Sequence, residues 1–210
     1  NDILGMPRPQ GAWDMGVHED SGAGEPALLS EAYVSKTGTN ATGDGSQGNP
    51  WATPSYALGY VAPSGMVRVA AGTYTNNIHF GADKRGITVR GGYSTTTWNW
   101  DPASNATVII GNGNSPGVFS IGADSNTLSH LTLRGGTSEA GIWMVGPTTS
   151  NAVEGCSIVS NNYGIRVTAV DPIRLHNTII ARNTFDGILD DYPAAAGTCL
   201  IYNCTVANNG

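Results

Sequence analysis

The sequence predicts an all-β protein, a solenoid of short parallel strands with a short helix at its N-terminal side. Glycine provides 29 of the 210 residues, which disfavours a helical bundle because each interior glycine costs a helix about 1 kcal/mol. Short apolar runs recur after residue 130, and each is followed by glycine or asparagine. A repeat of this kind is typical of solenoids, whose coils bury their inward side chains against one another.

The first expected element is a short helix that begins at residue 54. Thr53 is a typical N-cap residue, and Pro54 suits the first helical turn because its missing N–H is not needed there. The apolar face of this helix would consist of Tyr56, Ala57, Leu58, Tyr60 and Val61. Such a helix would cover the first coil of the solenoid, whose backbone groups and core are otherwise exposed.

The next elements are the strands of less regular coils. We expect them at residues 66–69, 77–80, 86–90, 107–110 and 117–121, each bounded by glycine, asparagine or proline. A polar loop is expected at residues 92–106, and it contains Tyr93, Trp98 and Trp100. Two interpretations of these rings stay open: they stack on sugars as a carbohydrate-binding platform, or they pack on the coils and anchor their loop.

The C-terminal half repeats one pattern: a hydroxyl residue, an apolar residue, then glycine or asparagine. The matched hydroxyl residues, at spacings of 25, 21 and 27, are Thr132, Ser157, Thr178 and Thr205. Second strand-like pieces lie between them, at residues 141–145, 164–168 and 187–190. An asparagine that would hydrogen-bond from coil to coil recurs as Asn161, Asn183 and Asn208. An antiparallel β-sandwich is the alternative, but it gives no reason for this order to return.

The charge and the cysteines limit the function. Lys and Arg number 10 against 16 Asp and Glu, and no basic cluster offers a nucleic acid a counter-charge. No stretch approaches the roughly 20 apolar residues that cross a bilayer. The cysteines are odd in number, so at least one of Cys156, Cys199 and Cys204 stays unpaired within the chain. A low share of charged residues with many Asn, Thr, Ser and Gly favours a secreted or cell-surface protein.

Part of the sequence resembles a known superfamily. Residues 33–91, with GNPWAT at 48–53 and VRVAAGTY at 67–74, are similar to the N-terminal portion of bacterial right-handed parallel β-helix proteins of the pectate-lyase-like superfamily. GGY at 91–93, with DPA at 101–103, is similar to the loop that follows in their surface-protein members. The resemblance implies a right-handed parallel β-helix. It leaves the activity open, because the fold hosts lyases, hydrolases, adhesins and structural proteins.

The N-terminal segment resembles the opposite end of the same superfamily, the part that closes a β-helix. It carries DILG at 2–5, PRPQG at 7–11 and WDMGV at 13–17. We therefore divide the chain into residues 1–26, a closing segment with its linker, and residues 27–210, a β-helix with an open C-terminal coil.

This inverted order has three interpretations. The chain is a piece of a longer series of tandem β-helix units, or the N-terminal segment of one subunit completes the open last coil of a neighbour, or residues 1–26 are a disordered leader. The second interpretation predicts a head-to-tail filament of copies of this chain, because a heterologous contact stays open unless its rotation closes. Its assembly interface would comprise Ile3, Leu4, Pro7, Pro9, Trp13, Met15, Val17, Cys204 and Val206.

Catalytic candidates are few. The enzymes of the superfamily cleave acidic polysaccharides, which requires a Ca²⁺ site of several carboxylates beside a base, or a carboxylate pair for hydrolysis. The dense acidic positions of the coils are Asp186, Asp190 and Asp191, with Arg166 as a basic neighbour. The motifs that accompany a paired aspartate in the polygalacturonase branch, Asn-Thr-Asp, Gly-His-Gly and Arg-Ile-Lys, do not occur in this sequence. The Asp190-Asp191 pair can also be interpreted as polar residues that lead from a strand into a turn.

Metal sites are not indicated by the sequence. None of the four histidines has a partner at a spacing typical of metal ligands. Ca²⁺ would find only the carboxylate of Asp44 in the segment 39–48, so a Gly/Asn turn is the simpler interpretation there. We expect no cofactor. The expected function is a structural unit of an exported or cell-surface assembly, and the alternative is a carbohydrate-binding or polysaccharide-cleaving β-helix module.

Overall fold

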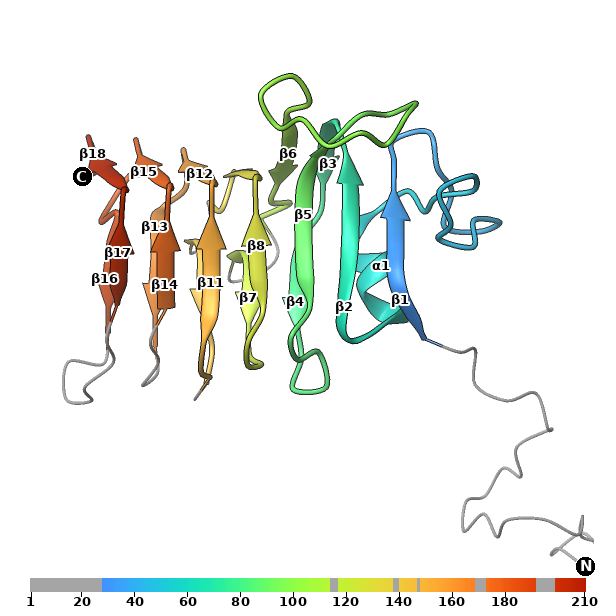
Figure 1. Cartoon of the computed structure of the whole chain (residues 1–210). Helices are drawn as coiled ribbons and strands as arrows, with labels where there is room; N and C mark the ends of the chain where they lie inside the picture. Colours follow the sequence, from blue (N-terminus) through green and yellow to red (C-terminus); the bar gives the residue numbers. More distant parts are fainter. Residues whose placement is uncertain (1–27, 114–116, 138–139, 147, 169–172, 192–198) are drawn as a thin grey trace, which may run out of the picture.

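The computed structural model describes residues 28–113, 117–137, 140–146, 148–168, 173–191 and 199–210. In these residues the chain runs through three sheets in turn and forms a parallel β-helix (Figure 1). Sheet A comprises β1 (Leu29–Val34), β2 (Val61–Ala70), β5 (Thr88–Tyr93), β8 (Thr127–Ser129), β11 (Asn151–Glu154), β14 (Ile173–His176) and β17 (Leu200–Tyr202). Sheet B comprises β3 (Gly72–Thr75), β6 (Thr107–Ile110), β9 (Thr132–Arg134), β12 (Ser157–Val159), β15 (Ile179–Ala181) and β18 (Thr205–Ala207). Sheet C comprises β4 (Ile78–Phe80), β7 (Gly117–Ile121), β10 (Ala140–Met144), β13 (Tyr163–Val167) and β16 (Ile188–Asp190).

The predicted fold class is confirmed. Strands pair in parallel in each of the three sheets, for example β8 with β11, β9 with β12 and β10 with β13, which rules out the antiparallel sandwich. Strands β6 and β7 have the expected bounds. The sequence pattern did not predict β8, β11, β14 and β17, the strands that these coils contribute to sheet A. These strands are three or four residues long, and no apolar periodicity is visible over such a length.

Inward ladders of aliphatic side chains form the core. In sheet B, the register stacks Ile109, Leu133, Ile158 and Ile180, which are all fully buried. Sheet A has a matching ladder of Val89, Leu128, Val153 and Leu175. Each such side chain contributes about 1.5–3 kcal/mol on burial. Since every rung lies between two neighbouring coils, a coil is stable only while its neighbours cover it.

The third repeat lies one residue away from its expected register. Ser157 pairs with Thr132 and with Ile179, not with Thr178. Thr178 instead occupies the same corner position as Cys156 and Cys204. At this position a thiol or hydroxyl donates to the carbonyl oxygen two residues earlier, at 3.5 Å for Cys156, 3.0 Å for Thr178 and 3.1 Å for Cys204. A hydroxyl therefore occurs at two different positions of the repeat, which caused the misalignment.

The predicted asparagine ladder exists, with one member corrected. Asn161 donates its amide to Oδ1 of Asn183 at 3.2 Å, and Asn183 donates to Oδ1 of Asn209 at 2.9 Å. Asn208 lies next to the ladder and not in it, because its φ of 53° places it in the left-handed region of the corner. The ladder satisfies buried backbone groups between sheets B and C, since the amide of Asn183 also donates to the carbonyl of Ile158.

The predicted helix is confirmed as α1 (Pro54–Tyr60), with Thr53 as the N-cap residue. The Thr53 hydroxyl makes no capping hydrogen bond; it accepts one from the amide of Asn40 at 3.0 Å. Val61, expected in the helix, is the first residue of β2. The buried residues of α1 pack on β1, β2 and β4, so the helix covers the N-terminal end of the core (Figure 1).

Glycines line the inner side of the asparagine ladder, and a side chain there is predicted to destabilise the fold. A Cβ atom on Gly164 would lie 2.5 Å from Ile180 Cγ2 and 3.0 Å from the amide nitrogen of Asn183. Gly164→Ala should therefore cost about 1–3 kcal/mol of unfolding free energy, as overpacking does. Gly59→Ala is the control, because Gly59 lies in α1 with no atom near its missing Cβ, and alanine there should be neutral or gain up to about 1 kcal/mol. Urea unfolding of both variants measures the difference, and equal stabilities would contradict the proposed packing.

Candidate functional site

The outer face of sheet A carries a row of polar and aromatic side chains. The row follows the register from strand to strand as Tyr33, Arg68, Arg90, Ser129, Glu154, His176 and Tyr202. Neighbouring positions in the same strands point inward and are buried, as Val89 and Leu128 are. The alternation of a strand therefore places all these groups on one surface.

Arg90, a member of this row, forms a cluster with Trp100 and His130. The Arg90 guanidinium carbon lies 4.0 Å from the centroid of the Trp100 ring, and the Trp100 edge meets the His130 ring at 5.0 Å. Trp100 is held by a hydrogen bond from its Nε1 to the carbonyl of Gly91 at 3.1 Å, yet 42% of the residue is exposed. The Nε of Arg90 is buried and has no hydrogen-bond partner among the described residues. The guanidinium is thus positioned by stacking on the Trp100 ring.

His130 lies at the corner between sheets A and B. Its φ of 55° belongs to a row of left-handed corners that continues through Gly155, Asn177 and Asn203. The His130 Nδ1 is 2.7 Å from the hydroxyl of Ser129. Burial lowers the pKa of His130, and the nearby Arg90 charge lowers it further, whereas Glu154 opposes the shift. The ring is therefore neutral at pH 7.

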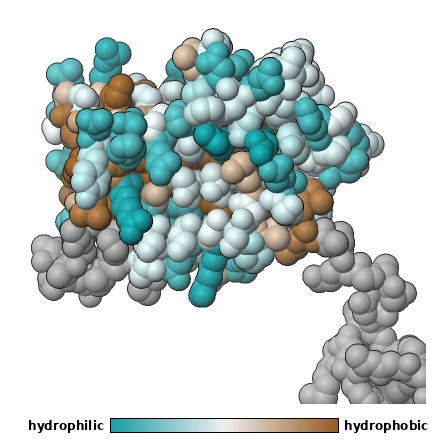
Figure 2. Space-filling model, in the orientation of Figure 1, coloured by the Kyte–Doolittle hydropathy of each residue, from teal (hydrophilic) through white to brown (hydrophobic). Residues whose placement is uncertain are grey.

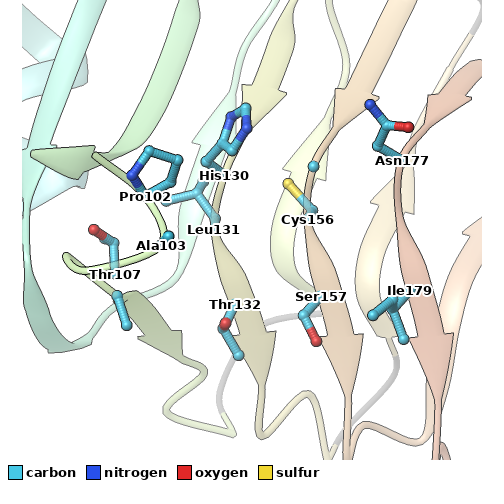
Figure 3. Close-up of a pocket in the computed structure, with 12 residues that line it drawn as sticks. Pro102, Ala103, Thr107, His130, Leu131, Thr132, Cys156, Ser157, Asn177 and Ile179 are labelled. Carbon is cyan, nitrogen blue, oxygen red and sulfur yellow. The ribbon is translucent and has the colours of Figure 1, made fainter. Parts of the chain in front are cut away.

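Two hollows meet at His130. The first, which we call the sheet-A hollow, has a volume of about 300 Å³ and is lined by Met66, Thr88, Arg90, Thr127, Ser129, His130 and Glu154. The second, the corner hollow, has a volume of about 340 Å³ (Figure 3). Its lining residues are Pro102, Ala103, Ala106, Thr107, His130, Leu131, Thr132, Gly155, Cys156, Ser157, Asn177 and Ile179. The two differ in charge, since Arg90 and Glu154 line only the first.

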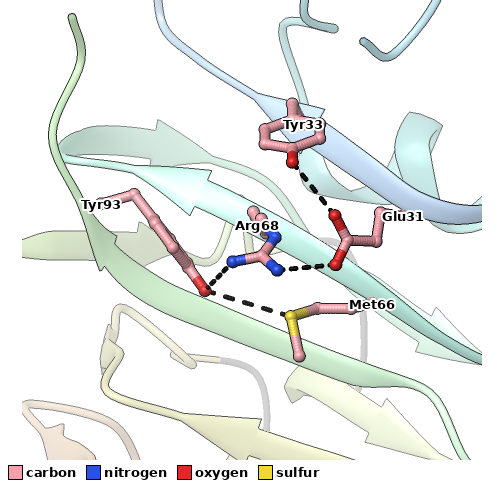
Figure 4. A network of polar contacts seen from close by, with 5 residues as sticks. All are labelled: Glu31, Tyr33, Met66, Arg68 and Tyr93. Atoms are coloured by element: carbon pink, nitrogen blue, oxygen red, sulfur yellow. Dashed lines mark hydrogen bonds and ion pairs between the residues drawn. The ribbon is translucent and has the colours of Figure 1, made fainter. Parts of the chain in front are cut away.

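The loop at residues 92–106 is anchored by a polar network next to these hollows (Figure 4). Arg68 bridges Glu31 at 2.6 Å and donates to the Tyr93 hydroxyl at 2.8 Å. Tyr93 is only 1% exposed, so its ring offers no open face to a sugar. Trp98 packs between Tyr33 and Tyr93, with ring centroids 4.9 and 6.4 Å away. Of the three aromatic residues expected as a sugar platform, Trp100 is the one with much of its surface exposed, and it contacts Arg90 and His130, which line the hollows.

The Arg68–Glu31 pair makes a pH-dependent contribution to stability. The hydrogen bond from Arg68 holds the pKa of Glu31 below its usual 4.5, and Tyr33 adds a further hydrogen bond. Because the folded pKa is the lower one, this stability is present above the unfolded value and is lost as the pH falls through the folded value. With 43% of the Glu31 side chain exposed, we expect less than about 1 kcal/mol. Urea unfolding at about pH 3 and pH 7 should show a smaller acid loss for Glu31→Gln than for the native chain; an equal loss would contradict this.

The expected catalytic residues lie on sheet C, away from both hollows. Arg166 forms an ion pair with Asp191 at 2.6 Å, and its guanidinium is 5.9 Å from the ring centroids of Trp143 and Tyr163. Asp186 precedes β16 and Asp191 follows it, so the strand separates the two carboxylates. Asp186 and Asp190 are exposed. The structure thus brings Arg166 and Asp191 together as an ion pair.

The candidate metal ligands lie in the turn at residues 39–48, and the candidate thiols are Cys156, Cys199 and Cys204. Within the described ranges, no group of three or more His, Cys, Asp or Glu side chains is arranged to bind a metal ion. In the segment 39–48, Asp44 accepts from the backbone N–H of Ser46 at 2.8 Å and Asn40 from that of Ala52 at 2.9 Å, as in a turn. The three cysteines are free thiols, and burial raises the pKa of Cys156 to about 12.

The expected assembly residues are only partly visible. Most of them belong to residues 1–26 and lie outside the described residues: Ile3, Leu4, Pro7, Pro9, Trp13, Met15 and Val17. Val206 is on β18 and is 48% exposed, and Cys204 directly precedes that strand. Apolar side chains gather at this end of the molecule in Figure 2.

The sequence alone did not identify the cluster of Arg90, Trp100 and His130. Arg90 and His130 are 40 residues apart, and only the register of β5 with β8 brings them together. One signal was available: a histidine followed by a regular Thr-Leu-Arg strand, at the corner position that glycine and asparagine occupy in later coils.

Comparisons with known proteins agree with this architecture. A family model described as right handed beta helix region matches residues 86–210. Among solved structures, that of pectate lyase Pel9A is similar with a TM-score of 0.56 and 18% sequence identity. The alignment covers 77% of this chain and 41% of the lyase chain, so this chain spans less than half of that structure, and the likeness concerns the fold. No curated protein matches the chain. Within the described part, no helix has the length and apolar character to cross a membrane. The family model matches more than half of the chain, residues 86–210, which shows that the chain belongs to the right-handed β-helix family.

Proposed function

We propose that the chain is a structural unit of an exported or cell-surface assembly, extended at strands β16, β17 and β18 by a further coil from a second copy. The observation that carries the proposal is the exposure of core positions at this edge. Ile201 continues the inward ladder of sheet A and Val206 that of sheet B, yet they are 47% and 48% exposed. Their counterparts one coil earlier, Leu175 and Ile180, are fully buried.

Backbone and side-chain groups of the edge both favour strand addition. Within the described residues, β16, β17 and β18 are each the last strand of their sheet. A strand that pairs there gains hydrogen bonds of about 0.5–1.5 kcal/mol each and buries the two exposed rungs. The N-terminal segment, residues 1–26, is the proposed source of the covering coil, because its sequence resembles a segment that closes a β-helix.

Deletion of residues 1–20 tests this proposal. The native chain should form species larger than a monomer as its concentration rises, and the deletion should abolish them while circular dichroism still reports folded coils. The control is Ile201→Lys with Val206→Lys in the full chain, which places charges on the edge and should abolish the same species. A native chain that sediments as a monomer at every concentration would contradict the proposal, as would assembly that survives the deletion.

Binding of an acidic polysaccharide in the sheet-A hollow is the second candidate function. The observation in its favour is Arg90, which lines the hollow and whose guanidinium stacks on Trp100, since carboxylates are natural ligands of a guanidinium. The similar fold belongs to a pectate lyase. We expect polygalacturonate to bind the native chain, and Arg90→Gln to weaken binding about tenfold or more. Unsaturated products formed in the presence of Ca²⁺ would instead assign cleavage and overturn a purely structural role.

A further inference from the structure

The corner hollow is built from uncharged groups. Its described lining contains no Asp, Glu, Lys or Arg side chain, in contrast to the sheet-A hollow beside it. His130, which both hollows share, is the single titratable imidazole, and its lowered pKa keeps it neutral at pH 7. Thus the hollow offers an ionic ligand no partner of opposite charge.

Hydrogen-bonding groups with spare capacity point outward from successive coils. Thr132 and Ser157 pair in register on β9 and β12, and their side chains lie side by side in Figure 3. Neither hydroxyl has a hydrogen-bond partner among the described residues, and both residues are partly exposed. Asn177, at the corner of the next coil, accepts a hydrogen bond from Asn203 at 3.2 Å, which leaves its own amide N–H groups to donate. These are donors and acceptors of the kind that sugar hydroxyls use.

Apolar groups complete the hollow. Ile179 takes the position after Thr132 and Ser157 in the same row and is 49% exposed. Pro102 and Ala103, from the loop at residues 92–106, bound the other end of the hollow (Figure 3). A sugar ring presents C–H groups on its faces and hydroxyls on its rim, so a surface of this mixed character suits it.

The spacing of the row matches an extended chain. Successive coils of a β-helix are about 4.8 Å apart, which is close to the length of one sugar unit in an extended glycan. A glycan that runs along the helix axis would therefore meet an equivalent position of the row at each unit: the hydroxyls of Thr132 and Ser157, then the apolar side chain of Ile179. We propose that the corner hollow binds an uncharged glycan chain in this orientation. The inference is independent of the structural role proposed above and concerns a different surface from the sheet-A hollow.

Titration calorimetry of the full chain with defined hexasaccharides tests the inference. The uncharged probes are cellohexaose, xylohexaose and mannohexaose, and the charged probe is hexagalacturonate. At least one uncharged probe should bind with a dissociation constant below about 1 mM, and Thr132→Val with Ser157→Ala should weaken it about tenfold by removing two hydrogen bonds. Both positions face outward, so the inward core ladder is unchanged.

Two controls separate the corner hollow from other surfaces. Thr73→Val changes the same type of side chain in the same outward row, two coils away and outside the hollow, and should leave the affinity unchanged. Glu154→Gln alters the sheet-A hollow, which Glu154 lines, and should also leave the affinity unchanged. The inference is overturned if no uncharged hexasaccharide binds, if the Thr132/Ser157 variant binds as well as the native chain, or if hexagalacturonate binds equally through these residues.

Discussion

Replacement of Ile180 by alanine is expected to lower the free energy of unfolding by about 2–5 kcal/mol. Ile180 is fully buried in the sheet-B ladder, where Ile158 lies on one side and Val206 on the other. Removal of its side chain leaves a cavity between coils that the flat strands cannot close. The loss of transfer free energy and the cost of the cavity therefore add.

The neighbouring residue gives a matched control in the same strand. Ile179 points outward from β15 and is 49% exposed, so Ile179→Ala should cost less than about 0.5 kcal/mol. Urea unfolding followed by circular dichroism measures both variants. Similar losses for the two would mean that β15 does not alternate between core and solvent as described, and the register of sheet B would be wrong.

Asn183→Ala is expected to cost about 3 kcal/mol, since it breaks the asparagine ladder at its middle. The Asn183 amide donates to Asn209 and to the carbonyl of Ile158, and its Oδ1 accepts from the backbone N–H of Asn161 at 3.1 Å. Alanine leaves these buried groups without partners, and each such group costs about 1–3 kcal/mol.

The control for the ladder is Asn162→Ala. The Asn162 side chain donates to the carbonyl of Thr137 at a more exposed place, so its loss should cost less than about 1 kcal/mol. Amide hydrogen exchange adds a local readout, because Asn183→Ala should first increase exchange of the backbone N–H groups at positions 161 and 183. Unchanged exchange there, with unchanged stability, would contradict the ladder.

The ladder of sheet B was predictable from sequence because an aliphatic residue recurs at a similar place in each repeat. Leu133, Ile158 and Ile180 recur at spacings of 25 and 22 residues, each shortly before glycine or asparagine, as in stacked coils. The strands of sheet A from β8 onward were not predictable in this way. In β8 and β11 a single aliphatic residue is fully buried, Leu128 and Val153, and one such residue in a strand of three or four gives no visible period.

The candidate site was less predictable than the fold. The contacts of Arg90 with Trp100, and of Trp100 with His130, depend on how the loop at residues 92–106 folds back over sheet A. A sequence pattern cannot give that placement, because the loop has no repeat. The acidic residues that stood out in the sequence, Asp190 and Asp191, lie at the end of β16 and directly after it, and Asp191 pairs with Arg166.

Hydrogen–deuterium exchange of the segment 199–210 at increasing protein concentration tests the central proposal most directly. If a further coil covers β17 and β18, exchange in this segment should slow as concentration rises, while the ladder amides of β9 and β12 keep the same rates. The slowing should disappear in Ile201→Lys with Val206→Lys. Rates in the segment that stay the same at every concentration would contradict the proposal that this edge joins one copy to the next.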